Sequence, residues 1–94
     1  MTEKELFTRN IQYHGEEQET TICMEECAEL IQAISKCKRY GCNNEYRDNL
    51  IEEIADVSII IDELKLIYNI DYQDISSIRQ KKIARMLKRI KNNL

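Results

Sequence analysis

Apolar residues recur along most of the chain at intervals of three and four positions, which is the spacing of one face of an α-helix. The pattern predicts four helices, over residues 3–12, 17–40, 45–68 and 74–91. Gly15 and Gly41 are expected to end the first two helices, because glycine tolerates the backbone conformation that follows a helix. Polar residues around Asn69 break the third helix, and Asp74 is expected to cap the fourth.

The apolar stripes of the three long helices are expected to form the core. They comprise Ile22, Cys23, Cys27, Leu30, Ile31, Ile34 and Cys37; Leu50, Ile54, Val57, Ile61, Leu64 and Ile67; and Ile75, Ile78, Ile83, Met86, Leu87 and Ile90. A chain of 94 residues buries a limited core, so apolar surface is expected to remain for contact with further copies. The sequence therefore predicts one all-α domain over residues 1–94, like a four-helix bundle, that assembles into a homodimer or homotetramer.

Composition favours helices over strands, because the chain has no proline and two glycines and is rich in Leu, Ile, Glu, Lys and Arg. The first nine residues are charged and lack the apolar run of a secretory signal. The longest apolar stretch, residues 57–61, is too short to span a bilayer. We therefore expect a cytoplasmic protein with no membrane partner.

The four cysteines are not expected to form a scaffold. A disulfide framework would need an export signal, and a structural zinc site usually has a tighter Cys-x-x-Cys pair than this chain offers. Cys23, Cys27 and Cys37 fall within an apolar helical pattern, so we expect them to be small buried side chains.

Charge is divided unevenly along the chain. All seventeen acidic residues lie before Arg79, and seven of the fourteen basic residues lie from Arg79 onward, where no residue is acidic. The basic last helix could bind polyphosphate or nucleic acid, neutralise an acidic bundle, or form an ordinary solvated face. A module that bound nucleic acid or a partner protein through this helix would leave the acidic motifs unexplained, so nucleic acid is the less favoured partner.

Two acidic motifs interrupt the apolar stripes. The second helix carries Glu-Glu-x-x-Glu, and the third carries Glu-Glu-x-x-Asp. Residues three apart share a helix face, so Glu26 pairs with Glu29 and Glu53 pairs with Asp56. Each pair continues an apolar line along its helix, which predicts that it points inward or into a cleft.

Carboxylates that face one another across two helices repel unless a cation lies between them. Four oxygen donors without nitrogen or sulfur favour a hard divalent ion, with Mg²⁺ the natural candidate and Mn²⁺ a substitute. Spacing alone leaves open the alternative of ordinary surface glutamates, which are common on helices. A carboxylate-bridged di-iron centre is excluded because it needs Glu-x-x-His motifs, and the one histidine, His14, lies in neither motif.

Two short segments contain the acidic pairs: Glu25-Glu26-Cys27-Ala28-Glu29-Leu30 and Glu53-Ile54-Ala55-Asp56-Val57. They resemble the MazG-like branch of the all-α nucleoside triphosphate pyrophosphohydrolases, whose signature is Glu-Glu-x-x-Glu, a spacer, and Glu-x-x-Asp. The spacer here, residues 30–52, falls within the usual range of that family, and residues 15–18 resemble a Gly-Glu-x-x-Gln segment common upstream of the signature. The resemblance extends over roughly residues 11–90 and implies the all-α pyrophosphatase fold.

The resemblance also implies an activity, the cleavage of a nucleoside or deoxynucleoside triphosphate between the α and β phosphates to give a monophosphate and pyrophosphate. By matching position, it implies that Glu26, Glu29, Glu53 and Asp56 bind Mg²⁺. Glu25 would hold an outer-sphere water or act as the base, and all five carboxylates would then be catalytic. Which of them activates the attacking water stays open, as does the preferred base.

Basic side chains are needed for the charge of the leaving pyrophosphate, and Lys82 and Arg85 are the best candidates. The family usually has a lysine and an asparagine in its last helix. Lys82 matches the lysine, whereas Met86 stands near the asparagine position and cannot replace it. Either basic residue could instead be ordinary surface charge. His14 could contact the base of the substrate or make a structural hydrogen bond.

Overall fold

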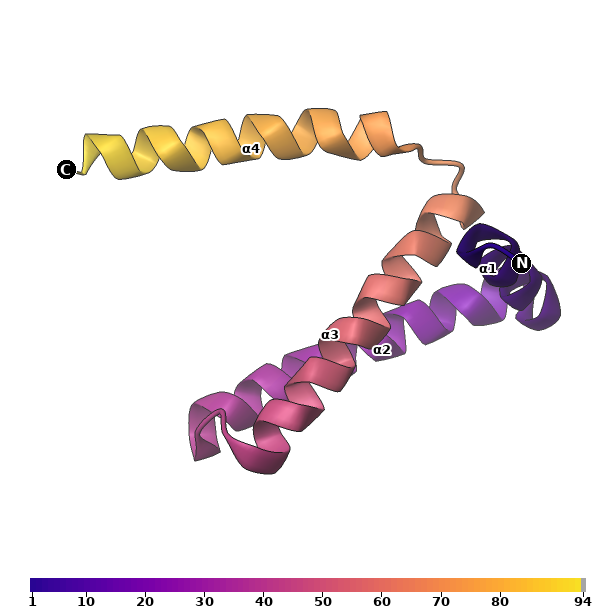
Figure 1. The fold of residues 1–94 in the computed structure, drawn as a ribbon, viewed down its shortest axis with the longest axis horizontal. Coiled ribbons are helices and arrows are strands. Elements are labelled where there is room, and N and C mark those ends of the chain that lie inside the picture. The colour runs from indigo at the N-terminus through magenta and orange to yellow at the C-terminus, as the bar shows by residue number, and fades with distance from the viewer. Residues whose placement is uncertain (94) are drawn as a thin grey trace.

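The computed structural model describes residues 1–93, and within them it contains four α-helices and no β-strand (Figure 1). The helices are α1 (Glu3–His14), α2 (Glu16–Tyr40), α3 (Asn44–Ile67) and α4 (Tyr72–Asn92). The all-α prediction is confirmed, and the predicted bounds agree with these to within two residues at every end. None of the described helices combines the length and the apolar character needed to cross a bilayer.

The helix ends follow from local chemistry. Gly15 and Gly41, with φ of 83° and 88°, end α1 and α2 as predicted, because side chains with a Cβ rarely adopt that conformation. The prediction that Asp74 is the N-cap of α4 is wrong. Asp71 is the N-cap, and it exchanges two hydrogen bonds of 3.0 Å with Asp74, in which each side chain accepts from the other residue's N–H. This capping box starts α4 two residues earlier than the sequence pattern predicts.

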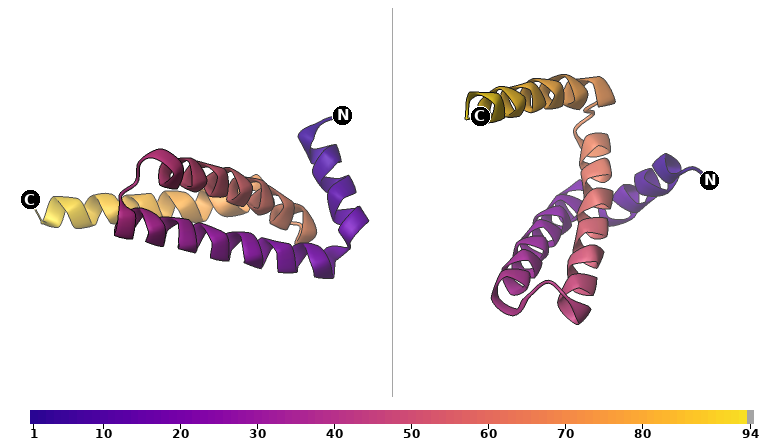
Figure 2. Two further views of the ribbon diagram at one scale, coloured as in Figure 1. Left: turned by 90° about the horizontal axis from the view of Figure 1, so that it is seen from below. Right: turned by 60° about the vertical axis from the view of Figure 1, so that its left-hand side comes forward.

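Helices α2 and α3 form an antiparallel hairpin around a short turn, and α1 packs across both of them (Figures 1 and 2). The buried apolar side chains are Ile11, Cys23, Ala33 and Ile60, which come from these three helices. Ala33 and Ile60 lie on the same helix faces as the two acidic pairs. The hairpin core therefore begins directly beside the acidic motifs.

Helix α4 contacts none of the other helices within residues 1–93 and runs away from the end of α3 (Figure 1). The four helices therefore do not close into a bundle within one chain. The apolar stripe of α4 is exposed, with Ile78, Ile83 and Met86 each about half exposed. The prediction that this stripe is core is wrong for the single chain, because no other helix of the chain covers it.

The hairpin also leaves predicted core residues uncovered, because two helices shield only one face of each other. Ile31 is 67% exposed and Ile54 is 54% exposed. Among the cysteines, Cys23 is buried as predicted and Cys37 is half-buried, whereas Cys27 is exposed. The apolar side of the α2–α3 hairpin is thus a second surface that the chain itself does not cover.

Candidate metal centre

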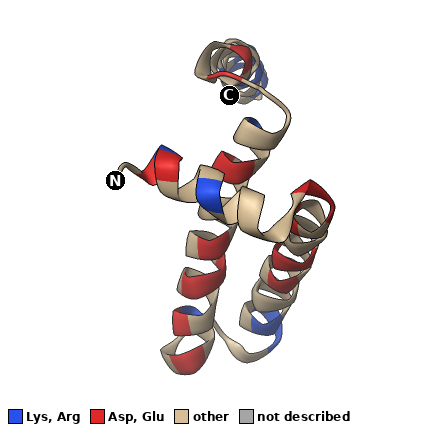
Figure 3. Cartoon of the chain, turned by 90° about the vertical axis from the view of Figure 1, so that its right-hand side faces the viewer, with Lys and Arg blue, Asp and Glu red and all other residues tan. Residues whose placement is uncertain are grey.

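The antiparallel hairpin brings the acidic motifs of α2 and α3 side by side (Figure 3). One carboxylate oxygen from each of Glu26, Glu53 and Asp56 lies within 4.8 Å of the others. Glu26 belongs to α2, and the other two residues follow one another by one turn on α3. We call these three residues the acidic cluster. The structure thus places three of the four predicted metal ligands together.

The remaining two carboxylates of the sequence prediction are exposed. Glu29 lies one turn after Glu26 on α2, and its charge raises the pKa of both Glu26 and Glu53, so it stands beside the acidic cluster. Glu25 is not among the carboxylates that lie together. One position along an α-helix turns a side chain by about 100°, so Glu25 points away from the line that Glu26 follows.

Two oxygens of the acidic cluster, Glu26 Oε2 and Glu53 Oε2, are buried and have no hydrogen-bond partner. Buried polar atoms nearly always have one, and a buried charge without a partner is more costly still. Burial raises the pKa of Glu26, and the charges of Glu29, Asp56 and Glu53 raise it further. Burial also raises the pKa of Glu53, with Glu29 and Asp56 the next causes. This arrangement is unfavourable alone and suits a hard divalent cation, which takes carboxylate oxygens as ligands.

A pocket of about 130 Å³ lies between α1, α2 and α3 and reaches the acidic cluster. Glu26 and Asp56 line it together with the apolar side chains of Ile22, Ile59 and Ile60. Apolar walls lower the local dielectric constant, which strengthens every charge interaction at this place.

The same pocket is lined by a second group, which we call the polar cluster: Asn10, His14, Glu19 and Glu63. Glu19 and Glu63 are 1% and 3% exposed, so both carboxyl groups are almost fully removed from water. The Asn10 amide donates to both of them, over 3.3 Å to Glu19 Oε1 and 2.9 Å to Glu63 Oε2. His14 Nδ1 lies 2.9 Å from Glu19 Oε2. The polar cluster therefore ties α1 to both helices of the hairpin.

Burial raises the pKa of Glu63, and the adjoining Glu19 carboxyl raises it further, while the hydrogen bond from Asn10 opposes the rise. Neither Glu19 nor Glu63 is among the site residues predicted from the sequence. The signal that could have found them is spacing, because Glu19 precedes Glu26 and Glu63 follows Asp56 by seven residues, two turns along the same helix face.

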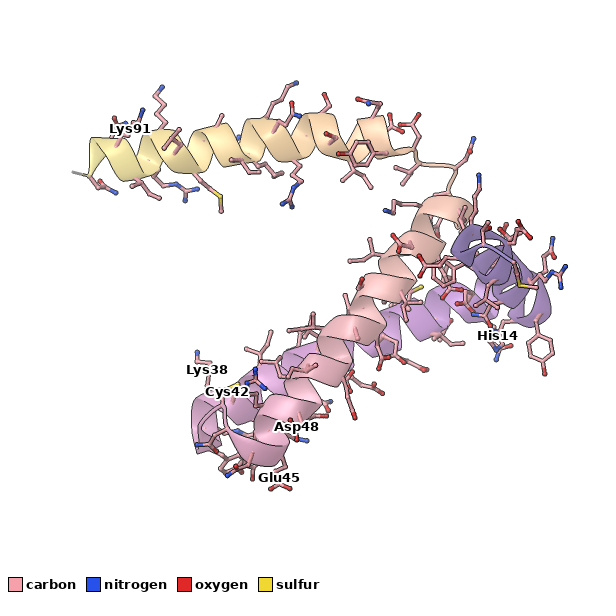
Figure 4. The ribbon with its side chains drawn as sticks, in the orientation of Figure 1. His14, Lys38, Cys42, Glu45, Asp48 and Lys91 are labelled. Atoms are coloured by element: carbon pink, nitrogen blue, oxygen red, sulfur yellow. The ribbon has the colours of Figure 1, made fainter. Side chains whose placement is uncertain are left out.

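Of the three predicted substrate-binding residues, His14 lines the pocket that reaches the acidic cluster, and the two residues on α4 do not. His14 lies at the end of α1 (Figure 4). Its ring hydrogen-bonds Glu19, as the structural alternative predicts, and a contact with the base of a substrate stays a prediction. Lys82 and Arg85 are exposed on α4, which does not contact the hairpin of its own chain. A basic group therefore reaches the acidic cluster from α4 only after α4 moves or from another copy of the chain.

Comparison of the chain with protein-family models, with curated proteins and with solved structures finds no significant match.

Proposed function

We propose that the chain is a Mg²⁺-dependent nucleotide pyrophosphohydrolase that cleaves nucleoside or deoxynucleoside triphosphates between the α and β phosphates. The observation that carries the proposal is the pair of buried oxygens, Glu26 Oε2 and Glu53 Oε2, that lack any partner beside a third carboxylate. A cation that satisfies both oxygens would remove their cost. The MazG-like signature in the same residues supports a nucleotide as the substrate.

The donors favour Mg²⁺ over softer metals. The acidic cluster offers carboxylate oxygens alone, whereas zinc and copper sites usually include nitrogen or sulfur. Mg²⁺ commonly takes one or two carboxylates and leaves its other positions to water and to phosphate oxygens. Glu26 and Glu53 would hold the ion, and the exposed Asp56 and Glu29 would complete the ligand set or bind its waters. Mn²⁺, with the same preference for oxygen, would substitute.

Held by Glu26 and Glu53, Mg²⁺ would offset the negative charge of the triphosphate and would act as a Lewis acid on its phosphate groups. The chain supplies a carboxylate that orients a water and accepts its proton, and Glu29 is the exposed candidate beside the cluster. The water oxygen bonds to the α-phosphorus as the bond from that phosphorus to the α–β bridging oxygen breaks. The products are the monophosphate and pyrophosphate.

We propose further that the active form is at least a dimer. The uncovered apolar side of the hairpin includes Ile31, Ile34, Ile54 and Ile61, all on the described surface. A patch of this kind marks an interaction surface in soluble proteins. Two hairpins that meet through these residues would form the four-helix bundle that one chain does not complete.

A second candidate is a binding module that uses α4. All seven basic residues after residue 78 lie on this exposed helix, which no described helix covers. Such a module would bind nucleic acid with an affinity that falls steeply as salt rises, and it would need no metal. It leaves the unpartnered oxygens of Glu26 and Glu53 unexplained.

Pyrophosphate release from each common NTP and dNTP, with and without Mg²⁺, tests the first proposal. Glu53→Gln should abolish turnover and keep the helical content, because it removes a metal ligand without changing shape. Glu52→Gln is the matched control, since it makes the same change of charge at the neighbouring exposed position and should retain activity. Full activity in Glu53→Gln, or turnover that does not need a divalent ion, would reject the site.

A further inference from the structure

We infer that α4 packs on the acidic side of the α2–α3 hairpin of a second copy of the chain and places Lys82 at that copy's acidic cluster. The inference rests on the proposed function for the role of Lys82, but the docking of α4 is tested without it. Each pair of chains would then contain two sites, each with carboxylates from one copy and a basic helix from the other.

Helix α4 has no packing partner for its apolar face within the described chain. It is 21 residues long, has no buried residue and contacts no other helix of the described chain. Most helical stability in proteins comes from packing an apolar face. The apolar stripe of α4 therefore requires a partner surface.

The chemistry of that surface can be deduced from the face that α4 presents. Lys82 lies four residues after Ile78 and four before Met86, so a cation lies within the apolar stripe. Arg79 lies in the same way between Ile75 and Ile83. A groove of about 790 Å³ runs along this face and is lined by these apolar and basic residues together with Ile70 and Asp74, and the Asp74 carboxylate is engaged in the cap of α4. Packing this face on a purely apolar surface would bury two unpaired charges, so the partner surface must offer carboxylates among apolar side chains.

The acidic side of the hairpin has that composition. Ile22 and Ile59 flank Glu26 and Asp56 along one pocket. The charge balance agrees, because residues 1–78 hold seventeen acidic and seven basic residues, a net charge of −10, and residues 79–94 have a net charge of +7. Two copies that exchange α4 would pair the basic helix of each with the acidic body of the other.

The conformation of the linker between α3 and α4 favours docking of α4 on a second copy rather than on the hairpin of its own chain. On its α3 side, the Ile70 N–H bonds to the Lys65 carbonyl over 2.9 Å, and Asn69 has a φ of 52°. On its α4 side, the capping box of Asp71 and Asp74 fixes the first turn. Both ends of the linker are therefore specified by hydrogen bonds, and in this conformation α4 contacts no helix of its own hairpin (Figures 1 and 2).

Zero-length cross-linking of a mixed-isotope sample tests the exchange. Equal amounts of ¹⁴N and ¹⁵N full-length protein are unfolded together, refolded and treated with a carbodiimide, which joins a lysine amine directly to a carboxylate. We expect Lys82 to link to the peptides of the acidic cluster with one light and one heavy partner. Lys81, whose side chain is turned by about 100° around α4 from that of Lys82, is the internal control and should not link to them. Links only between peptides of equal label would show that α4 folds onto its own hairpin, and no link from Lys82 would show that it docks elsewhere; either result overturns the inference.

Mixing two inactive variants tests the exchange of α4 through the activity that returns. Glu53→Gln and Lys82→Ala should each be inactive alone. When the two variants are refolded as an equal mixture, random pairing makes half of the dimers mixed. Each mixed dimer has one complete site and one defective site, so about one quarter of the unmodified activity should return. No recovery in the mixture would overturn the inference. If the unmodified protein does not hydrolyse nucleotides at all, the proposed function fails, while the isotope pattern of the cross-links still decides whether α4 is exchanged.

Discussion

Replacing Glu26 by Gln should stabilise the metal-free protein and at the same time remove its response to Mg²⁺. The substitution keeps the shape of the side chain and removes one of three charges whose oxygens lie within 4.8 Å of one another. Two unit charges at that distance repel by about 3 kcal/mol at an effective dielectric constant of about 20. Since Glu26 is only half-buried, solvent screening reduces the gain to about 1 kcal/mol, or about 5 °C in melting temperature for a chain of this size.

Thermal unfolding at one protein concentration, with a chelator or with excess Mg²⁺, measures both effects. A ligand at one hundred times its dissociation constant stabilises the folded state by about 2.7 kcal/mol, so the unmodified protein should melt well above its metal-free form. Glu26→Gln should melt higher than the unmodified protein in chelator and gain little from Mg²⁺. Glu52→Gln, with the same change of charge outside the acidic cluster, should keep the full response.

Two results would refute this reasoning. A lower melting temperature for Glu26→Gln in chelator would show that the carboxylate is held by favourable contacts rather than by repulsion. An undiminished Mg²⁺ response in the same variant would show that the ion binds without Glu26.

Three further predictions follow from the geometry. The folded state raises the pKa of Glu26 and Glu53, so it binds more protons than the unfolded state. The melting temperature of the metal-free protein should therefore rise as pH falls from neutral through those raised pKa values, and bound Mg²⁺ should make the melting temperature depend less on pH. Asn10→Ala removes the donor shared by two buried carboxyl groups and should lower the free energy of unfolding by about 2 kcal/mol in urea titrations, whereas alanine at an exposed α1 position should change it little. The Sγ atoms of Cys37 and Cys42 lie 2.7 Å apart as free thiols, so a mild oxidant should close an intramolecular disulfide, seen by mass spectrometry as the loss of two hydrogens that Cys42→Ser prevents.

The sequence predicted helix bounds well because local chemistry sets them. Gly15 and Gly41 end helices through their own backbone conformation. Composition alone does not distinguish Asp71 from Asp74 as the cap of α4, because both are aspartates. The core was predicted less well. The spacing of apolar residues predicts which face of a helix is apolar, but it does not predict what covers that face. Ile31 and Met86 are exposed because no other part of the described chain covers them.

In the candidate site, too, some residues could be predicted from the sequence and others only from the packed structure. Glu26, Glu53 and Asp56 could be found because spacing along a helix fixes which residues share a face, and the short turn makes the two faces meet. The roles of Glu19 and Glu63 depend on α1, which crosses the hairpin at an angle that its own sequence does not fix. Only the packed structure shows that Asn10 reaches them both.

Helix α1 bonds to the hairpin through that amide and through His14, and Ile11 is its one buried apolar side chain. A helix that is attached through a few directional hydrogen bonds should detach in a single step, because each bond is lost over a small displacement, whereas an apolar contact weakens gradually. The first twelve or so residues should therefore detach as one unit well before the hairpin melts, and the backbone amides of α1 should exchange with deuterium faster than those of α2. Since the bonds that hold α1 line the pocket beside the acidic cluster, a bound ion would slow that exchange at a distance.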